Sequence, residues 1–459
     1  MLTTLILAAQ IAFTSPVHLP ISLAGNFGEP RPNHFHGGID VRTEMVEGKP
    51  LFAVAEGYVS RITIGLYGFG NALYIQHPNG TTSVYCHLRG YVPALRQIVS
   101  AKRRALGQKD ELDRPHNPSD ELDIRLRPTD YPVECGQLVA ISGNTGHSVA
   151  PHLHLEVHNT RSWAMLDPLD FLRDLLVDNT PPQAHAFMAY PQPGEGIFNG
   201  FTKNQYFGFG QTFPAWGRVG FGIWADDYMD DTYHHYGIRR TELRVDGNLV
   251  FSSNVDSIPM YCNRMVNSWG DYHHRLRSNV WYMKSFLEPG LSIPCITANN
   301  DRGIVTFNEE RPYHIVYTLT DIYGNKADFS FTVQGTRQHI PKARRPQYAK
   351  VFRWNRPNQL QLPGAQLIVR QGNLPTDVEV SPRVTPRPDA FSDEYIFAER
   401  STPLFQGATL TLRLNRIPAD PSRLCLHSGN RDIPVTYHDG WVTAIVKDLG
   451  QTYYVTIQN

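Results

Sequence analysis

The chain has 459 residues with 43 basic and 43 acidic side chains, so its formal net charge is zero when histidine is counted as neutral. A protein that binds nucleic acid or an anionic membrane through bulk charge normally has a basic excess, and none exists here. At roughly 100–200 residues per domain, the length predicts two to four domains. The 36 Gly and 34 Pro residues, with abundant Tyr and Phe, favour strands and turns over helical bundles. We therefore expect a mostly β protein that has no nucleic acid as a partner.

An apolar run opens the chain. Leu2–Phe13 is too short to span a bilayer, which takes ~20 residues, but it is typical of the central region of a signal peptide and contains the small pair Ala8–Ala9. No Lys or Arg precedes the run, and a first buried strand is the alternative interpretation. We take residues 1–16 as a signal peptide, which predicts a periplasmic, cell-envelope or secreted protein. No other segment of the sequence has the length and apolarity of a transmembrane helix.

Residues 17–178 read as a first β-rich domain. Glycine turns separate short β-branched or aromatic runs, a pattern typical of antiparallel sheet; these runs are Leu51–Val54, Tyr58–Ile64, Ala72–Gln76, Ser83–His87 and Leu138–Ser142. Apolar residues from Pro93 to about Glu111 recur near helical spacing. They predict a helix inside an insertion over about residues 92–132. A short helix over Leu166–Leu176 is expected to close the domain.

Two further β modules are expected beyond this domain. Asn179–Pro182 is a stiff boundary, because proline removes a hydrogen-bond donor and favours extended geometry before it. In residues 179–336, Gly237–Val250 predicts two strands around an Asp-Gly turn, and Tyr313–Val333 predicts a second hairpin. A basic, proline-containing linker at 337–346 leads to a module at 347–459. We interpret both as β-sandwich modules, the first Ig-like, that could take a protein partner.

The five cysteines are too few and too widely spaced for a disulfide framework. They include no CxxC pair. Cys262 and Cys295 could form one bridge, and buried free thiols are an equally good interpretation.

Three segments of the first domain hold His or Asp at suggestive spacing. His36 and Asp40 are four residues apart around two glycines, which let the backbone bend so that both side chains can turn toward one point. His152 and His154 are two residues apart, so on a strand both point to one face while Leu153 points into a core. His87 follows an apolar run. Imidazole and carboxylate ligands suit Zn²⁺, and three protein ligands leave a fourth position open to water, as in catalytic zinc sites.

The order of these motifs resembles the lysostaphin/LytM-type zinc metallopeptidases, which cut peptides of bacterial peptidoglycan. The resemblance covers about residues 25–172, and it includes flanking features in the family order: Glu56–Val59, Gly70–Asn71 and Ser142–Gly146. It implies zinc bound by His36, Asp40 and His154. It implies that His87 and His152 are not ligands but orient water or stabilise the oxyanion. Candidate substrate contacts are Asn71, Tyr85 and His147.

The resulting hypothesis is an exported, zinc-dependent endopeptidase that hydrolyses stem or cross-link peptides of peptidoglycan. One alternative is a catalytically silent protein with the same fold that activates another cell-wall hydrolase, although such proteins have lost metal ligands. Another is a structural zinc protein, which would need a fourth protein ligand. Competing peptidase chemistries lack support, because the sequence has neither HExxH nor GxSxG. Cys86 and His87 are adjacent on a predicted strand and would point to opposite faces.

Other polar clusters receive weaker interpretations. His34 is an alternative ligand beside His36. Trp269–His274 is interpreted as an aromatic loop. An acidic–histidine cluster in the second module could hold a cation, but a solvated loop is the favoured interpretation; its members are Asp226, Asp227, Asp230, Asp231, His234 and His235.

Overall fold

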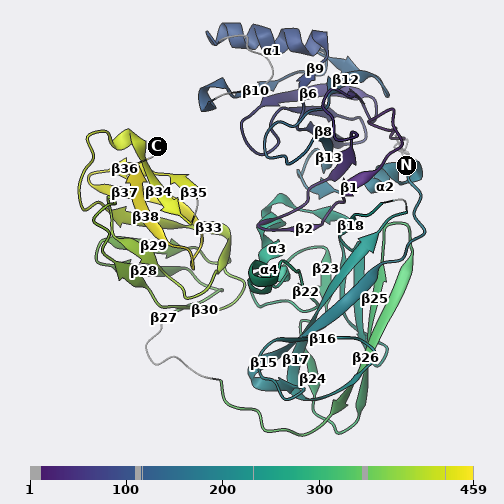
Figure 1. The fold of residues 1–459 in the computed structure, drawn as a ribbon, viewed down its shortest axis with the longest axis vertical. Helices are drawn as coiled ribbons and strands as arrows, with labels where there is room; N and C mark the ends of the chain where they lie inside the picture. Colours follow the sequence, from purple (N-terminus) through teal and green to yellow (C-terminus); the bar gives the residue numbers. More distant parts are fainter. Residues whose placement is uncertain are drawn as a thin grey trace, which may run out of the picture.

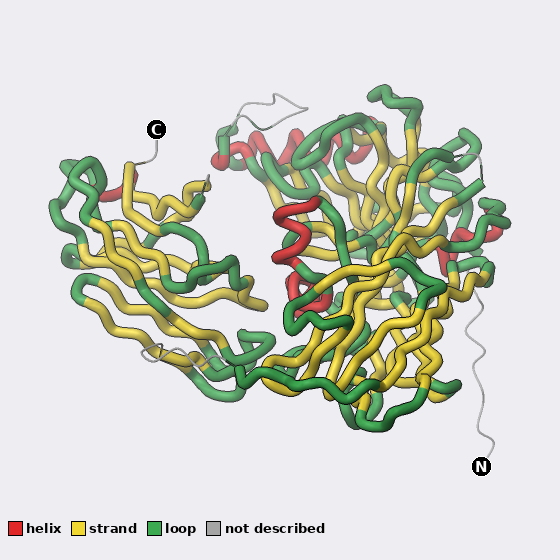
Figure 2. Tube along the Cα trace, turned by 60° about the horizontal axis from the view of Figure 1, so that its bottom comes forward, coloured by secondary structure: helices red, strands yellow, loops and turns green. Residues whose placement is uncertain are grey.

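The three largest hydrophobic clusters among the described residues form the cores of three strand-rich bodies (Figure 1). The computed structural model describes residues 12–108, 115, 117–230, 232–343, 350–429 and 431–457. The mostly β fold predicted from composition is confirmed. Figure 2 shows how few helices accompany the strands.

The first body is built on an antiparallel sheet in the order β1-β4-β13-β8-β7-β6-β10. A smaller sheet, β5-β12-β9, lies beside it. The bounds in the main sheet are β1 Leu23–Gly25, β4 Ile39–Arg42, β13 His152–Asn159, β8 Thr81–Cys86, β7 Ala72–Gln76, β6 Gly57–Ile64 and β10 Leu122–Arg125, with β11 Pro132–Val133 and β14 Met165–Leu166 at its margins. The smaller sheet has β5 Pro50–Phe52, β12 Leu138–Ile141 and β9 Gly90–Tyr91, and a short hairpin has β2 Pro30–Arg31 and β3 His34–Phe35.

The predicted insertion contains the expected helix, α1 (Pro93–Ala105), drawn along the top of Figure 1. Proline stands in its first turn, where a missing N–H costs nothing, and basic residues fill its last turn, where they favour the helix dipole. The closing helix is also present, as α2 (Leu169–Leu172) followed by a 3-10 turn over Arg173–Leu175.

Most of the predicted signal peptide, residues 1–11, lies outside the described residues. The described residues at the end of this predicted segment pack on the first domain. Phe13 is 9% exposed and stacks on Phe171, with ring centroids 4.9 Å apart, and the backbone N–H of Thr14 donates to the carbonyl of Val54. No helix in the described ranges is long and apolar enough to cross a membrane.

The second body has a large sheet in the order β16-β15-β17-β26-β25-β19-β20-β23. Both predicted hairpins are present, one of them turning at Asp246 and Gly247, whose positive φ angles of 50° and 79° suit a tight turn. The strand bounds are β15 Gln183–Phe198, β16 Gln205–Phe207, β17 Thr212–Tyr228, β18 His235–Tyr236, β19 Arg240–Val245, β20 Asn248–Asn254, β21 Ser257–Ile258, β22 Met283–Lys284, β23 Ile296–Ala298, β24 Val305–Phe307, β25 Pro312–Thr320 and β26 Lys326–Gly335.

The expected aromatic loop at 269–274 is wrong. This segment instead lies in a helical insertion made of the 3-10 helix Met260–Met265, α3 (Val266–Trp269) and α4 (Tyr272–Ser278). The ring of Trp269 is buried, and its indole N–H donates to the carbonyl of Lys284. The aromatic residue thus packs in the core, because burying a large ring stabilises more than exposing it to water.

The third body packs two five-stranded sheets face to face around one core. One sheet runs β28-β29-β33-β37-β36 and the other β31-β32-β38-β34-β35, with the separate pair β27-β30. Their bounds are β27 Lys350–Phe352, β28 Asn358–Leu362, β29 Ala365–Val369, β30 Val378–Val380, β31 Arg383–Thr385, β32 Glu394–Ile396, β33 Pro403–Arg413, β34 Leu424–Ser428, β35 Arg431–Pro434, β36 Thr436–His438, β37 Trp441–Asp448 and β38 Tyr453–Ile457.

The helical insertion of the second body touches both other bodies. The side-chain oxygens of Asn267 and Asn263 accept the backbone N–H groups of Asn33 and Phe35, which belong to the hairpin before His36. Arg264 donates to the carbonyl of Leu404 in the third body. Strand β21 also extends the first sheet by pairing with β14. The second body therefore supports the segment that leads into the candidate site.

All five cysteines are free thiols, so the possible bridge between Cys262 and Cys295 does not form in this structure. The Cys262 thiol instead donates to the carbonyl of Ser292. Burial, together with the neighbouring Cys262, raises the pKa of Cys295 to about 12, which keeps its thiol protonated at neutral pH.

Candidate metal centre

Strand register brings Asp40 and His154 together. Strand β4 runs antiparallel to β13, and Asp40 is the direct partner of His154 across this pair. Directly opposed residues on neighbouring strands present their side chains on the same face. The alternate residues Leu153 and Leu155 are fully buried in the core on the other face, as predicted.

His36 reaches the same point because two glycines follow it. A Cβ on Gly38 would lie 2.1 Å from the carbonyl oxygen of Leu155, and one on Gly37 would lie 2.4 Å from Oε1 of Glu156. Neither glycine has a positive φ. Their role is therefore to allow the backbone to approach β13 closely, and not to provide an unusual turn as the sequence suggested.

The three predicted ligand side chains converge. Nε2 of His36 lies 3.0 Å from Oδ1 of Asp40 and 3.0 Å from Nδ1 of His154, and that nitrogen lies 2.8 Å from the same Asp40 oxygen. The exposed fractions are 1% for His36 and 7% each for Asp40 and His154. Among the described residues this is one of two acidic or histidine groups whose ligand atoms lie close enough to share an ion.

Outer hydrogen bonds fix the orientation of both imidazoles. The Nδ1–H of His36 donates to the carbonyl of Asn26 at 2.6 Å, and the Nε2–H of His154 donates to Oε1 of Glu156 at 3.0 Å. The remaining ring nitrogens then carry lone pairs toward the centre. Although burial opposes it, the hydrogen bonds from His154 and His158 hold the pKa of Glu156 well below its ordinary value.

This donor set fits a metal ion. Two imidazole lone pairs face each other beside a carboxylate oxygen, an arrangement that repels unless a cation lies between the three atoms. Two nitrogens and one oxygen are the ligand types that zinc accepts in three-ligand sites. Arg31 holds the second oxygen of Asp40 at 2.9 Å and orients the carboxylate.

His87 and His152 lie beside the three ligands. The ring centroids of these two histidines are 5.0 Å apart, and that of His87 is 5.8 Å from that of His154. Their Nδ1–H groups donate to the backbone carbonyls of Thr145 and Ala150. In each ring Nε2 is left to accept a proton. Nε2 of His152 lies 3.4 Å from Oδ1 of Asp40.

His87 occupies an unusual backbone position. It follows β8 with a φ of 60°, which is uncommon for a residue other than glycine and is often found at functional sites. Burial, followed by the nearby His154 and His152, lowers its pKa to about 4. The imidazole is therefore neutral at pH 7 and able to take up a proton.

The candidate substrate contacts have different outcomes. Tyr85 is a correction, because its ring is fully buried in the core and its hydroxyl donates to the carbonyl of Phe52 while accepting the N–H of Val54. His147 is exposed on the glycine-rich turn. Asn71 is 1% exposed, and its backbone N–H donates to Oγ1 of Thr145, so it supports that turn from below.

Two further residues near the site behave as ordinary structure. His34 is exposed and its Nδ1 is 3.2 Å from the Pro32 carbonyl, outside the ligand group. Burial raises the pKa of Cys86 well above its ordinary value, and its thiol is fully buried. A reactive cysteine instead needs partly exposed, electropositive surroundings that lower the pKa of its thiol.

Glu156 and Arg31 contact the ligands and were not predicted. The signal for Glu156 was present in the sequence, since His154, Glu156 and His158 alternate along β13 and must share one face. Nothing in the local pattern pointed to Arg31, whose approach to Asp40 depends on how the β2-β3 hairpin folds back.

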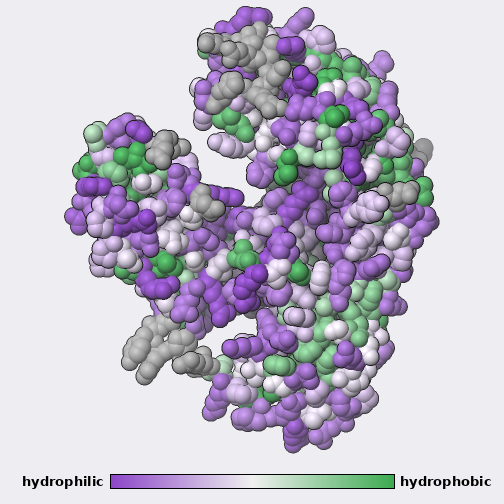
Figure 3. Space-filling view, in the orientation of Figure 1, coloured by the Kyte–Doolittle hydropathy of each residue, from purple (hydrophilic) through white to green (hydrophobic). Residues whose placement is uncertain are grey.

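The surface has one open depression near the candidate site and another on the third body. One is lined by Tyr67, Phe69 and Gly70 and by Glu121 and Asp123 of the insertion, and the Phe69 ring stacks 6.0 Å from that of His154. The insertion thus forms one wall of this depression, and Phe69 connects the depression to the candidate metal centre. Figure 3 shows that the surface of the protein in this view is largely hydrophilic.

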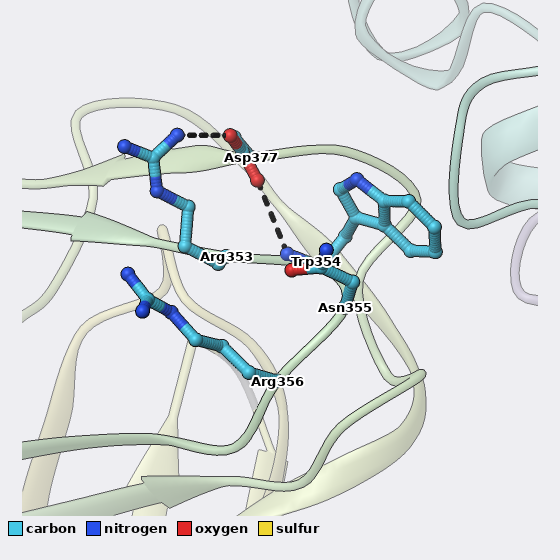
Figure 4. Close-up of a pocket in the computed structure, with 5 residues that line it drawn as sticks. All are labelled: Arg353, Trp354, Asn355, Arg356 and Asp377. Atoms are coloured by element: carbon cyan, nitrogen blue, oxygen red, sulfur yellow. Dashed lines mark hydrogen bonds and ion pairs between the residues drawn. The ribbon is translucent and has the colours of Figure 1, made fainter.

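A second depression lies on the third body. Figure 4 shows it lined by Arg353, Trp354, Asn355, Arg356 and Asp377. There Asp377 accepts from the Arg353 guanidinium and from the Trp354 backbone N–H.

Comparison with known proteins agrees with the geometry. Residues 34–108 match the family described as peptidase family M23, and residues 349–458 match the Zu5-like domain. An uncharacterized metalloprotease from Haemophilus influenzae is 29% identical over 123 residues, which cover 27% of this chain and 18% of that protein. The chain therefore matches less than a fifth of that relative's length.

Solved structures give weaker likenesses. A zinc-containing peptidase from Vibrio cholerae has 23% identity and a TM-score of 0.24, with 34% of this chain and 39% of that chain covered. The lysostaphin catalytic domain from Staphylococcus simulans has 22% identity and a TM-score of 0.23, with 33% and 92% covered. Both TM-scores are low, so the assignment rests on the sequence match and the motifs.

The family match and the named relative indicate a protein of the metalloprotease class. More specifically, residues 34–108 of the first domain match peptidase family M23, which agrees with the resemblance of its motifs to the lysostaphin/LytM-type peptidases.

Proposed function

We propose that this protein is an exported, zinc-dependent endopeptidase that hydrolyses stem or cross-link peptides of peptidoglycan. The observation that carries the proposal is the convergence of His36, Asp40 and His154 within 3.0 Å, with His87 and His152 beside them. The match of residues 34–108 to family M23 supports the substrate class and the exported location. The third body could bind a protein partner or position the enzyme.

His36, Asp40 and His154 would hold the zinc. When bound, zinc supplies Lewis-acid polarisation of the scissile carbonyl and lowers the pKa of water to ~7. The described ligand group has three protein members, which favours a catalytic site over a structural one with four.

The two other histidines supply proton transfer. Hydrolysis of an amide needs a base that takes a proton from the attacking water and an acid that delivers one to the leaving amine. His87 is neutral at pH 7, and its Nδ1–H bond to Thr145 fixes the tautomer in which Nε2 accepts. His152 has the same arrangement through Ala150. Once protonated, either ring can donate a hydrogen bond to the developing oxyanion.

The test is digestion of purified peptidoglycan by the full chain, with released fragments identified by mass spectrometry. We expect new amino termini within wall peptides in the presence of zinc, and none after chelation. His34→Ala is the matched control, because His34 is exposed and lies only two residues before His36. Tight zinc binding without cleavage of any wall peptide would overturn the proposal and favour a silent, hydrolase-activating protein.

A further inference from the structure

The sequence placed Asp227 in a solvated acidic loop, and the structure contradicts this. Asp227 is 2% exposed near the end of β17, and it lies with Asp178 and Asp321, which are 6% and 3% exposed. Ligand oxygens of the three carboxylates lie within 4.8 Å of one another. Of its predicted neighbours, Asp226 instead pairs with His185, and Asp231 lies outside the described residues.

The three aspartates come from different parts of the chain. Asp178 lies in the segment that leaves the first body, just before the proline-rich boundary. Asp227 belongs to β17 and Asp321 follows β25, both in the second body. Asn325 joins the two sides, because its Nδ2 donates to the backbone carbonyl of Asp178 and to Oδ2 of Asp321. The cluster therefore sits at the joint between the two bodies.

Some of the carboxylate oxygens are anchored and others lack a partner. Oδ1 of Asp178 accepts the N–H of Thr180, and Oδ1 of Asp321 accepts the N–H groups of Gly324 and Asn325. Oδ2 of Asp178 and Oδ1 of Asp227 are buried and have no hydrogen-bond partner. A buried carboxylate oxygen without a partner is costly, so such groups are normally paired or bound to a metal.

No basic side chain of the described residues forms an ion pair with any of these three aspartates. Burial, followed by the charges of Asp321 and Asp178, raises the pKa of Asp227 to about 8. Burial and mutual repulsion thus oppose ionisation of all three aspartates together, and a bound cation would remove that opposition.

We propose that Asp178, Asp227 and Asp321 form a calcium site that fixes the first body to the second. An all-oxygen ligand set selects a hard cation and not zinc. Calcium accepts irregular geometry with carboxylates, carbonyls and waters, whereas magnesium demands a near-ideal octahedron. The site is separate from the zinc centre, which uses other residues on β4 and β13, so the proposal does not depend on peptidase activity.

The first experiment is calorimetric titration of the zinc-saturated full chain with calcium chloride. One bound calcium per chain is expected, with magnesium chloride binding at least tenfold more weakly. Asp227→Asn and Asp321→Asn should each weaken binding by tenfold or more. Asp226→Asn, at the preceding residue on β17, should bind as the unmodified protein does. Absent calcium binding at millimolar concentration, or unchanged binding by Asp227→Asn, would overturn the proposal.

A second experiment separates a ligand role from a merely structural one. Calcium should raise the melting temperature of the unmodified protein and leave that of Asp227→Asn unchanged. In calcium-free buffer, Asp227→Asn should melt at the same temperature as the unmodified protein or higher, because the raised pKa of Asp227 already keeps its carboxyl largely protonated and the amide is likewise uncharged. A variant that is destabilised equally with and without calcium would show that Asp227 has only a packing role.

Discussion

Oε1 of Glu156 lies 3.0 Å from Nε2 of His154, and the other oxygen of the same carboxylate contacts Nε2 of His158. Glu156 is 4% exposed and stands two residues after His154 on one strand. The carboxylate therefore fixes Nδ1 as the nitrogen of His154 that faces His36 and Asp40, and Glu156 itself lies outside that group of candidate ligands.

Replacing Glu156 with Gln should weaken zinc binding ~10–100-fold, the usual effect of losing a residue that orients a metal-bound histidine. The neutral amide makes a weaker acceptor and allows the His154 ring to turn. Competition with a coloured chelator measures the affinity. Glu134→Gln, at an exposed position, should change nothing. Equal affinity in both variants would show that Glu156 is only a packing residue.

Mutation of His154 and mutation of His152 should have different effects on zinc content and activity. His154→Ala is expected to lose both zinc and activity, because its Nδ1 is one of the three converging atoms. His152→Ala should retain zinc while kcat falls ~10²–10⁴-fold, the typical contribution of a general acid or base. Metal content by atomic emission, measured on the same samples as peptidoglycan cleavage, checks both statements. Loss of zinc from His152→Ala would instead make it a ligand.

The amide pair between Asn33 and Asn267 should support the metal centre from a distance. Asn267 accepts the Asn33 backbone N–H at 2.9 Å and donates to its side-chain oxygen at 3.1 Å. Asn267→Ala leaves that N–H unpaired, which costs ~1–2 kcal/mol in the free energy of unfolding. Cleavage should also slow, because the hairpin before His36 loosens. A drop in stability with unaltered kcat/KM would confine the role of Asn267 to folding.

Tyr85→Phe tests the correction to the substrate contacts. Removing the hydroxyl leaves the Val54 N–H and the Phe52 carbonyl without this partner, so the free energy of unfolding should fall by ~1–2 kcal/mol. KM for wall peptides should not change, since the ring is buried away from the surface. Denaturant unfolding and steady-state kinetics measure the two quantities. A raised KM without a change in stability would restore the substrate role.

His77 should make the first domain sensitive to acid. Its imidazole is 2% exposed, and burial lowers its pKa below 6.5, although the hydrogen bond to the Glu56 carbonyl opposes the shift. The unfolded chain then binds this proton more readily than the folded one, so the stabilisation is complete above pH 6.5 and declines as the pH falls.

The measurement is the melting temperature against pH for the unmodified protein and for His77→Gln. The variant should be less stable at pH 8, and its deficit should shrink as the pH falls below 6.5. Because both proteins keep the metal-centre histidines, the difference isolates His77. A deficit that is constant across this range would show that protonation of His77 does not affect stability.

Much of this protein was predictable from its sequence alone. Short β-branched or aromatic runs between glycine turns located most first-domain strands. Apolar residues at helical spacing located the helix of the insertion. The two-residue period of a strand placed His152 and His154 on one face. The order of short motifs indicated the resemblance to lysostaphin/LytM-type peptidases, with which the family match of residues 34–108 agrees. These properties are local, because they depend on residues that are close together in the sequence.

Tertiary structure decided which distant residues meet. The register of β4 against β13 sets Asp40 opposite His154, and Gly38 admits His36 only because β13 passes so close. Tyr85 turned out to be a core residue, and Asp227 became one corner of a buried cluster. Burial and partnership depend on segments far apart in the chain. A linear pattern records which side chains can carry charge, but packing alone determines which of those charges are removed from water and brought together.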